Sequence, residues 1–237
     1  MMNTSRNSLE KHFKRKRSRM DWTLVEHRAS GTWGDTTALI DTLDLRTGLS
    51  IQSGPWQGSS IGALPAITPT NNAASIETYV RGTDLVTTHP ATNTRPTRVQ
   101  LYWRRWHELP AKVSAAIELI ASVQTHLLDS DPTLMIETRF PTATGALHFD
   151  DSIEVLADSR HLLILQHPQD GTETELLKIP DGSRGALTRH TLFRRRLEKG
   201  VILRGRLLYI WSDQGVDADS LQECTDRFNF SEPLLTA

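Results

Sequence analysis

The sequence predicts a mainly β protein, a single antiparallel domain of the β-sandwich type with a C-terminal α-helix. Short runs of β-branched, aromatic and aliphatic residues recur along the chain, and turn-forming Gly, Pro, Asn or Asp residues separate them. A chain of 237 residues is long enough to bury one face of each strand, and all-β domains of this size commonly stay undivided. Packing two sheets face to face achieves that burial.

Most of the expected strands lie in the middle of the chain. Residues 76–80 and 85–89 flank a tetrapeptide at 81–84 whose glycine suits a tight hairpin turn. The segment 23–29 is a candidate first strand, whereas 35–45 fits a short helix and a short strand equally. The remaining expected strands span 97–107, 133–140, 153–156, 162–167 and 175–179.

The segment 112–128 is compatible with two structures. Ala116 and Ile120 belong to a set of apolar residues at helical spacing, yet Leu119 and Ala121 belong to another set that alternates as in a strand. The strands expected on either side favour β for this segment.

The C-terminus has the pattern of an amphipathic helix. Asp217 is suited to cap its first turn, and Leu221, Cys224 and Phe228 form an apolar stripe that ends before Pro233. We expect this helix to cover one end of the β structure.

The charge distribution separates an N-terminal arm from the rest of the chain. Residues 1–19 hold seven Lys or Arg residues and one acid, a local charge of +6. Removing that +6 from the total of −1 leaves −7 for residues 20–237, which repel nucleic acid on average. Nucleic-acid binding is therefore expected only through the arm. The arm has the composition of a disordered segment, and either Met1 or Met20 is the natural start.

Residues 46–75 are rich in Gly, Pro, Ser, Thr and Asn, which predicts a long surface loop. The expected organisation is thus a basic arm at 1–19 followed by one β-rich domain at 20–237 that contains this loop. Loops of such length commonly carry function.

The segment 192–211 carries the most concentrated chemistry of the chain. Two runs of strand-forming residues flank 198–200, where Gly200 suits a positive φ, so we expect an antiparallel hairpin. If Leu197 faces Val201 across the turn, one face of this hairpin collects four arginines. These are Arg194, Arg196, Arg204 and Arg206.

Arginines directly across a ladder repel one another unless negative charge lies among them. One source of that charge is the chain itself, through the acid-rich segments 129–158 and 207–237, with acids such as Asp150, Asp213, Asp217 or Asp219. The other source is an anionic ligand or a partner protein. A planar guanidinium group can bind a carboxylate or phosphate with two hydrogen bonds. The internal source is favoured, because charged surfaces are usually solvated or paired within the chain.

A second candidate site lies on the expected strand 97–107, where Tyr102, Arg104 and Trp106 alternate and so share a face. Such a face suits sugar stacking or cation–π contact, which makes carbohydrate binding, or a carbohydrate-active hydrolase, the alternative function. Large aromatic residues more often fill cores, and that structural role is favoured here.

Local catalytic motifs are absent from the sequence. It has no nucleophile elbow, phosphate-binding glycine loop or Cys-x-x-Cys pair, and His148 and Asp150 lack a third ligand at metal-binding spacing. We therefore expect no metal and no cofactor, and favour a non-enzymatic protein. The single cysteine excludes an internal disulfide, and neither a signal peptide nor a membrane-spanning apolar run is present. These features predict a cytoplasmic protein that does not enter a membrane.

Three functional hypotheses result. The first is a binding module that takes a protein or an anionic ligand on the arginine face of the expected hairpin. The second is carbohydrate binding through the face of Tyr102 and Trp106. The third is nucleic-acid binding through residues 1–19.

Overall fold

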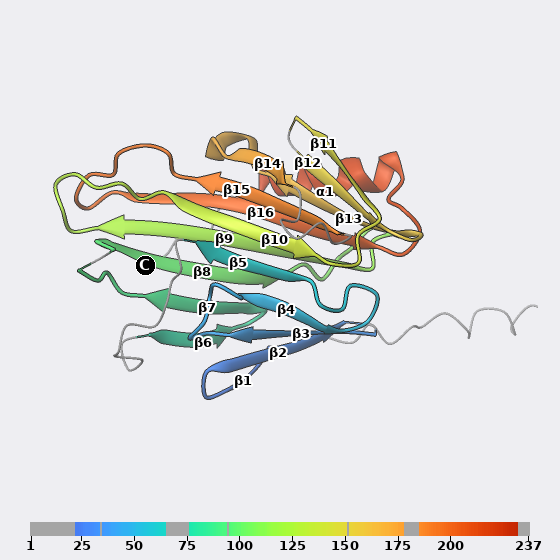
Figure 1. The fold of residues 1–237 in the computed structure, drawn as a ribbon, viewed down its shortest axis with the longest axis horizontal. Helices are drawn as coiled ribbons and strands as arrows, with labels where there is room; N and C mark the ends of the chain where they lie inside the picture. Colours follow the sequence, from blue (N-terminus) through green and yellow to red (C-terminus); the bar gives the residue numbers. More distant parts are fainter. Residues whose placement is uncertain are drawn as a thin grey trace, which may run out of the picture.

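The computed structural model of this protein describes residues 22–33, 35–64, 76–93, 95–150, 152–177 and 185–231. These residues form two eight-stranded sheets packed face to face, with one α-helix on the outer face of one sheet (Figure 1). Every ladder between the strands is antiparallel. The predicted fold class, a mainly β sandwich with a C-terminal helix, is confirmed. The basic arm at 1–19 lies outside the described residues.

The first sheet, sheet A, has the strand order β1-β2-β3-β4-β5-β10-β15-β14. Its strands are β1 (Thr23–Val25), β2 (Arg28–Trp33), β3 (Thr36–Asp41), β4 (Leu49–Ser53), β5 (Ser60–Leu64), β10 (Leu134–Phe140), β14 (Glu173–Leu177) and β15 (Ala186–Leu192).

The second sheet, sheet B, has the order β11-β12-β13-β16-β9-β8-β7-β6. Its strands are β6 (Glu77–Arg81), β7 (Asp84–His89), β8 (Thr97–Arg105), β9 (Ala115–Thr125), β11 (Gly145–Phe149), β12 (Ser152–Ala157), β13 (Arg160–Gln166) and β16 (Ile202–Ser212). A short 3-10 turn (Pro168–Asp170) follows β13, and the helix α1 (Ala218–Phe230) follows β16.

The chain moves repeatedly from one sheet to the other. The strands β9 and β10 belong to different sheets, as do β10 and β11, β13 and β14, and β15 and β16. Strands that follow one another in the sequence are therefore often not hydrogen-bonded partners. The two longest strands, β9 and β16, are neighbours within sheet B and pair at ten positions.

The inward faces of the two sheets form one hydrophobic core. The rings of Trp33 in β2 and Trp211 in β16 lie 5.8 Å apart and so join the two sheets. A hydrogen bond of 3.1 Å between the hydroxyl groups of Thr138 in β10 and Tyr209 in β16 crosses the same space. All six tryptophans of the chain are buried, so their large apolar surfaces contribute to the interior.

Strand β9 confirms the β interpretation of the segment 112–128. All its residues are buried except Gln124, because sheet A covers one face and other side chains of the chain cover the opposite face. A strand that is buried on both faces has a nearly continuous apolar pattern. Such a pattern contains helical spacings as well as alternation, which explains why the sequence fitted both structures.

Near the N-terminus one strand prediction is corrected and one ambiguous segment is resolved, and one further strand lies at the edge of sheet B. The segment 23–29 is not one strand, because a turn with Glu26 at φ +52° separates β1 from β2. The ambiguous segment 35–45 contains the strand β3. The edge strand β11 was not expected, since its residues are all at least partly exposed and show no alternation of burial.

The long loop expected at 46–75 is also corrected, because it contains β4 and β5. Its glycines permit a close approach of two backbone segments. A Cβ atom on Gly62 would lie 1.9 Å from the carbonyl oxygen of Arg46, and one on Gly48 would lie 1.9 Å from that of Ile61. The glycine content therefore reflects packing of the 45–48 turn on β5, where only glycine fits.

Helix α1 forms as predicted. The Asp217 carboxylate accepts a hydrogen bond of 2.8 Å from the backbone N–H of Ser220 and caps the first turn. Cys224 and Phe228 pack on the outer face of sheet B, against apolar residues of β13 and β16. No helix among the described residues has the length and apolarity needed to cross a membrane.

Two buried histidines predict a pH dependence of stability. Burial, with a smaller effect of Arg95 on His89 and of His148 on His190, lowers the pKa of each to about 4. In the unfolded chain a histidine takes up its proton near pH 6.5. The unfolded state therefore binds more protons between pH 6.5 and pH 4, so the free energy of unfolding falls as the pH falls through this window, by up to about 3 kcal/mol per histidine.

Urea denaturation at several pH values tests this dependence. The variants His89→Gln and His190→Gln, measured separately, should each lose less stability than the wild type between pH 6.5 and pH 4. If the free energy of unfolding depends on pH in both variants as it does in the wild type, other groups cause the acid sensitivity.

Candidate functional site

The arginine-rich segment 192–211 does not form the expected hairpin. Strand β15 ends at Leu192 in sheet A, and β16 begins at Ile202 in sheet B. Strand β16 pairs with β9 along one edge and with β13 along the other, so neither edge is available to β15. The residues between them, 193–201, form a connection that crosses from one sheet to the other, and we call it the crossing connection.

Local contacts hold the crossing connection in place. Phe193 has a φ of +64°, which turns the chain away from β15. Leu197 is buried and exchanges two backbone hydrogen bonds with Ser130, of 3.1 and 3.0 Å. The expected turn is present: Val201 donates its backbone N–H to the carbonyl oxygen of Glu198, and Gly200 has a φ of +81°.

The four predicted arginines therefore do not share one face. Arg194 and Arg196 lie on the crossing connection and are exposed, whereas Arg204 and Arg206 lie on β16 and point to the outer side of sheet B. Arg204 is half-buried opposite Ser122 of β9. Arg206 is buried.

Arg206 belongs to a buried charge network centred on Glu118 of β9. Its Nη1 lies 3.8 Å from Glu118 Oε1, and Arg104 Nη1 lies 3.7 Å from Glu118 Oε2. The indole N–H of Trp106 donates to the same Oε2 at 3.3 Å. Asp84 pairs with Arg104 at 3.2 Å and extends the network. Burial raises the pKa of Glu118, while Arg104, the Trp106 indole and Arg206 act in the opposite direction.

This network attaches helix α1 to sheet B. The Arg206 guanidinium donates to the carbonyl oxygen and the hydroxyl of Ser231, at 2.8 and 3.0 Å, and lies 5.5 Å from the centre of the Phe228 ring. The Arg227 guanidinium lies 4.5 Å from the centre of the Trp106 ring. Arg206 and Trp106 therefore fix the helix, a role that the sequence did not indicate for the arginine.

The aromatic face expected on 97–107 is covered. Trp106 is buried beneath α1, and Tyr102 is buried beside Val86 and Ile120. The Tyr102 hydroxyl donates to the side-chain oxygen of Gln100 at 2.7 Å. Neither ring offers an open surface for stacking, which agrees with the structural role favoured from the sequence.

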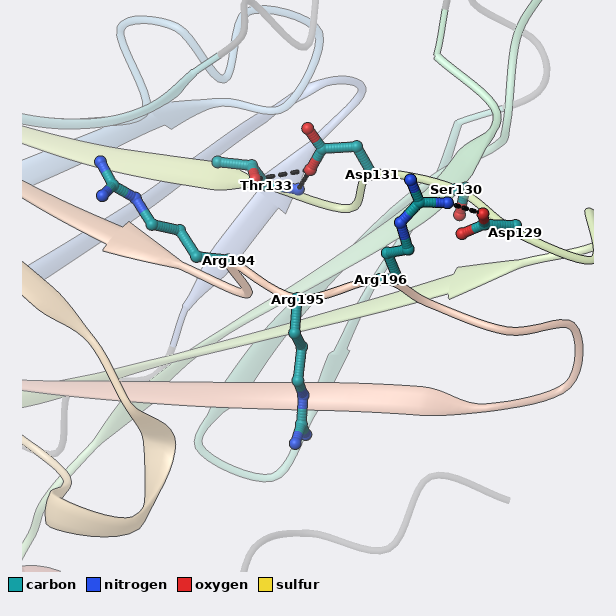
Figure 2. A pocket seen from close by; sticks show the side chains of 7 residues that line it. All are labelled: Asp129, Ser130, Asp131, Thr133, Arg194, Arg195 and Arg196. Carbon is teal, nitrogen blue, oxygen red and sulfur yellow. Dashed lines mark hydrogen bonds and ion pairs between the residues drawn. The ribbon is translucent and has the colours of Figure 1, made fainter.

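An open pocket of about 630 Å³ lies where the crossing connection meets the loop between β9 and β10 (Figure 2). We call it the arginine pocket. It is lined by Asp129, Ser130, Asp131, Thr133, Arg194, Arg195 and Arg196. The three arginines are consecutive on a connection whose backbone is fixed at Leu197, and in Figure 2 Arg195 points to the opposite side from Arg194 and Arg196.

Two of these three arginines have partners within the chain. Arg196 forms an ion pair with Asp129, and Arg194 forms one with Glu173. The predicted internal pairing is confirmed for Arg194, Arg196 and Arg206. Asp129 lies in the expected acid-rich segment 129–158, whereas Glu173 and Glu118 lie outside both expected segments. Asp217, one of the acids that the sequence singled out, instead caps α1 and pairs with Lys112 at 3.0 Å.

Arg195 differs from its neighbours. Its side chain is exposed, and none of the described residues forms an ion pair with it. In Figure 2 it points away from both aspartates of the pocket. Asp131 is occupied by Thr133, whose hydroxyl and backbone N–H donate to it at 2.6 and 3.0 Å and lower its pKa.

Sequence reasoning missed Glu118 and Glu173, which pair with Arg206 and Arg194, and included Asp129 as one of the acids of the segment 129–158. A signal for Glu118 is present, since it is the one charged residue within the otherwise apolar run of 115–121. An acid in a strand buried on both faces needs a cationic partner. No comparable signal marks Asp129, because its contact with Arg196 depends on how two distant loops meet.

His148 and Asp150 do not form a metal site with other described residues. His148 is exposed on β11, and Asp151 lies outside the part of the chain that the structure describes. Within that part, no group of three or more His, Cys, Asp or Glu side chains is placed to hold a metal ion.

Comparisons with known proteins add little. No protein-family model and no curated protein sequence matches this chain. Among solved structures, the chain is similar to a putative kojibiose phosphorylase from human microbiome, with 10% sequence identity and a TM-score of 0.36. The match covers 85% of this chain and 23% of that chain, so this chain spans about a quarter of its length. A likeness at this level carries no argument about function.

The Glu118 network predicts a large difference between two acid-to-alanine variants. Glu118→Ala leaves the guanidinium groups of Arg104 and Arg206 without their shared counter-charge in a buried site, which should lower the free energy of unfolding by about 3–5 kcal/mol. Asp129→Ala removes an exposed ion pair and should cost less than about 1 kcal/mol. Urea denaturation measures the free energy of unfolding of both variants. Similar losses in the two would contradict the assigned role of Glu118.

Proposed function

We propose that this protein is a non-enzymatic binding module that takes a ligand carrying a carboxylate or phosphate group in the arginine pocket. The observation that carries the proposal is Arg195, an exposed arginine of the pocket with no ionic partner among the described residues. A planar guanidinium group has donors placed to grip a carboxylate or phosphate with two hydrogen bonds.

The surroundings of Arg195 support this assignment. Glu173 and Asp129 neutralise Arg194 and Arg196, so Arg195 is the arginine of the pocket whose charge no described residue offsets through an ion pair. The buried Leu197 fixes the backbone beside them, which lowers the conformational entropy lost when a ligand binds. The carbohydrate alternative has no comparable support, because all six tryptophans are buried.

Phosphate titration tests the proposal with the smallest suitable anion. At low ionic strength, inorganic phosphate should cause saturable NMR shifts in the backbone amides of the crossing connection. Arg195→Gln should weaken this binding about tenfold or more, since it removes a charge-assisted pair of hydrogen bonds.

The control variant is Arg139→Gln, which removes one exposed arginine from β10 with the same change in net charge. It should leave phosphate binding unchanged. If both variants weaken phosphate binding equally, the effect comes from the change in net charge. If saturable binding survives in Arg195→Gln, Arg195 is not the binding group.

A further inference from the structure

Exposed aliphatic side chains gather next to the arginine pocket. They lie at the end of β9 and at the start of β16, and we call them the aliphatic patch. The patch consists of Leu127, Leu128, Val201 and Ile202. Leu128 is the most exposed of them, with 83% of its surface accessible. Single exposed aliphatic residues are common on protein surfaces, whereas a contiguous group marks an interaction site.

The backbone places the four residues of the patch on neighbouring segments. Ile202 faces Gln124 across the β9–β16 ladder, and the backbone N–H of Gly200 donates to the carbonyl oxygen of Thr125 at 3.4 Å. A few residues further along both segments, Ser130 and Leu197 exchange their two hydrogen bonds. The patch therefore lies on the same pair of joined loops as the arginine pocket.

The charges around the patch indicate the chemistry of its partner. Arg195 and Lys199 are exposed cations, and none of the described residues forms an ion pair with either. The two loops, 126–133 and 193–202, hold four basic residues against three acids. This balance fits a partner with one or two carboxylates better than an anionic bilayer, which attracts surfaces of larger positive charge.

We propose that the aliphatic patch and the arginine pocket together dock an extended peptide segment of a partner protein, in which an Asp or Glu residue lies beside aliphatic side chains. The inference rests on the proposed function, because the peptide carboxylate is the anion that Arg195 takes. Burial of the partner's aliphatic side chains against Leu128 and its neighbours supplies the apolar part of the binding free energy.

Selection from a random peptide library against the full chain tests this inference. The enriched peptides should combine Asp or Glu with neighbouring Leu, Ile or Val. Their affinities, measured by fluorescence anisotropy, should fall at least about tenfold in Arg195→Gln and in the double variant Leu128→Ser/Val201→Ser.

Matched controls remove an arginine and an aliphatic side chain elsewhere. Arg139→Gln on β10 and Val25→Ser on β1, where the valine is exposed, should leave the peptide affinity unchanged. The absence of enrichment, a consensus without acids, or peptides that bind the double variant as well as the wild type would each overturn the inference.

The phosphate titration distinguishes failure of the inference from failure of the proposed function. If phosphate binding depends on Arg195 but peptide binding does not depend on Leu128 and Val201, the proposed function stands and the peptide partner is wrong. If neither depends on Arg195, both are wrong. Dimerisation, or sedimentation with phosphatidylserine vesicles, that Leu128→Ser abolishes would assign the patch to a second copy or to a membrane and overturn the inference.

Discussion

The pairing of β16 along both of its edges is the constraint on which the rest of the structure depends. Strand β9 occupies one edge over ten positions, and β13 occupies the other. The preceding strand β15 therefore has no place beside β16 and lies in sheet A. The chain between them must cross the sandwich, and Arg194, Arg195 and Arg196 fall within that crossing.

The same constraint buries charge on the outer face of sheet B. Arg206 and Glu118 lie on neighbouring central strands, where α1 covers them. Removing such charges from water is costly, so the arrangement is stable only when each charge has a partner. Arg104 and Arg206 offset the charge of Glu118, the Trp106 indole donates a hydrogen bond to its Oε2, and Arg206 in turn hydrogen-bonds the end of α1. Two predicted site residues, Arg206 and Trp106, thus stabilise the fold.

Sequence reasoning succeeded where local chemistry decides the structure. The cap at Asp217, the apolar stripe through Cys224 and Phe228, and the turn at Gly200 depend on neighbouring residues. It failed for the segment 192–211, because β15 and β16 each satisfy the pattern of a hairpin strand. Only the competition of β9 and β13 for the edges of β16 excludes the hairpin, and no local pattern records that competition.

The candidate site was also predicted only in part, because its contacts join segments that are distant in the sequence. The predicted cluster of Arg194, Arg196, Arg204 and Arg206 did not include Arg195, and of its members Arg194 and Arg196 line the pocket, where two loops that are distant in the sequence meet. Asp129 and Glu173 neutralise Arg196 and Arg194, and Arg195 between them has no ionic partner among the described residues. The ion pairs that form in the folded protein therefore distinguish one arginine from another, and the number of arginines in the sequence does not.

A crystal structure of the protein grown in inorganic phosphate tests this central claim most directly. We expect a phosphate ion within hydrogen-bonding distance of the Arg195 guanidinium, with Arg196 still paired to Asp129. An Arg195 side chain paired with a carboxylate of its own chain, and no anion in the pocket, would contradict it.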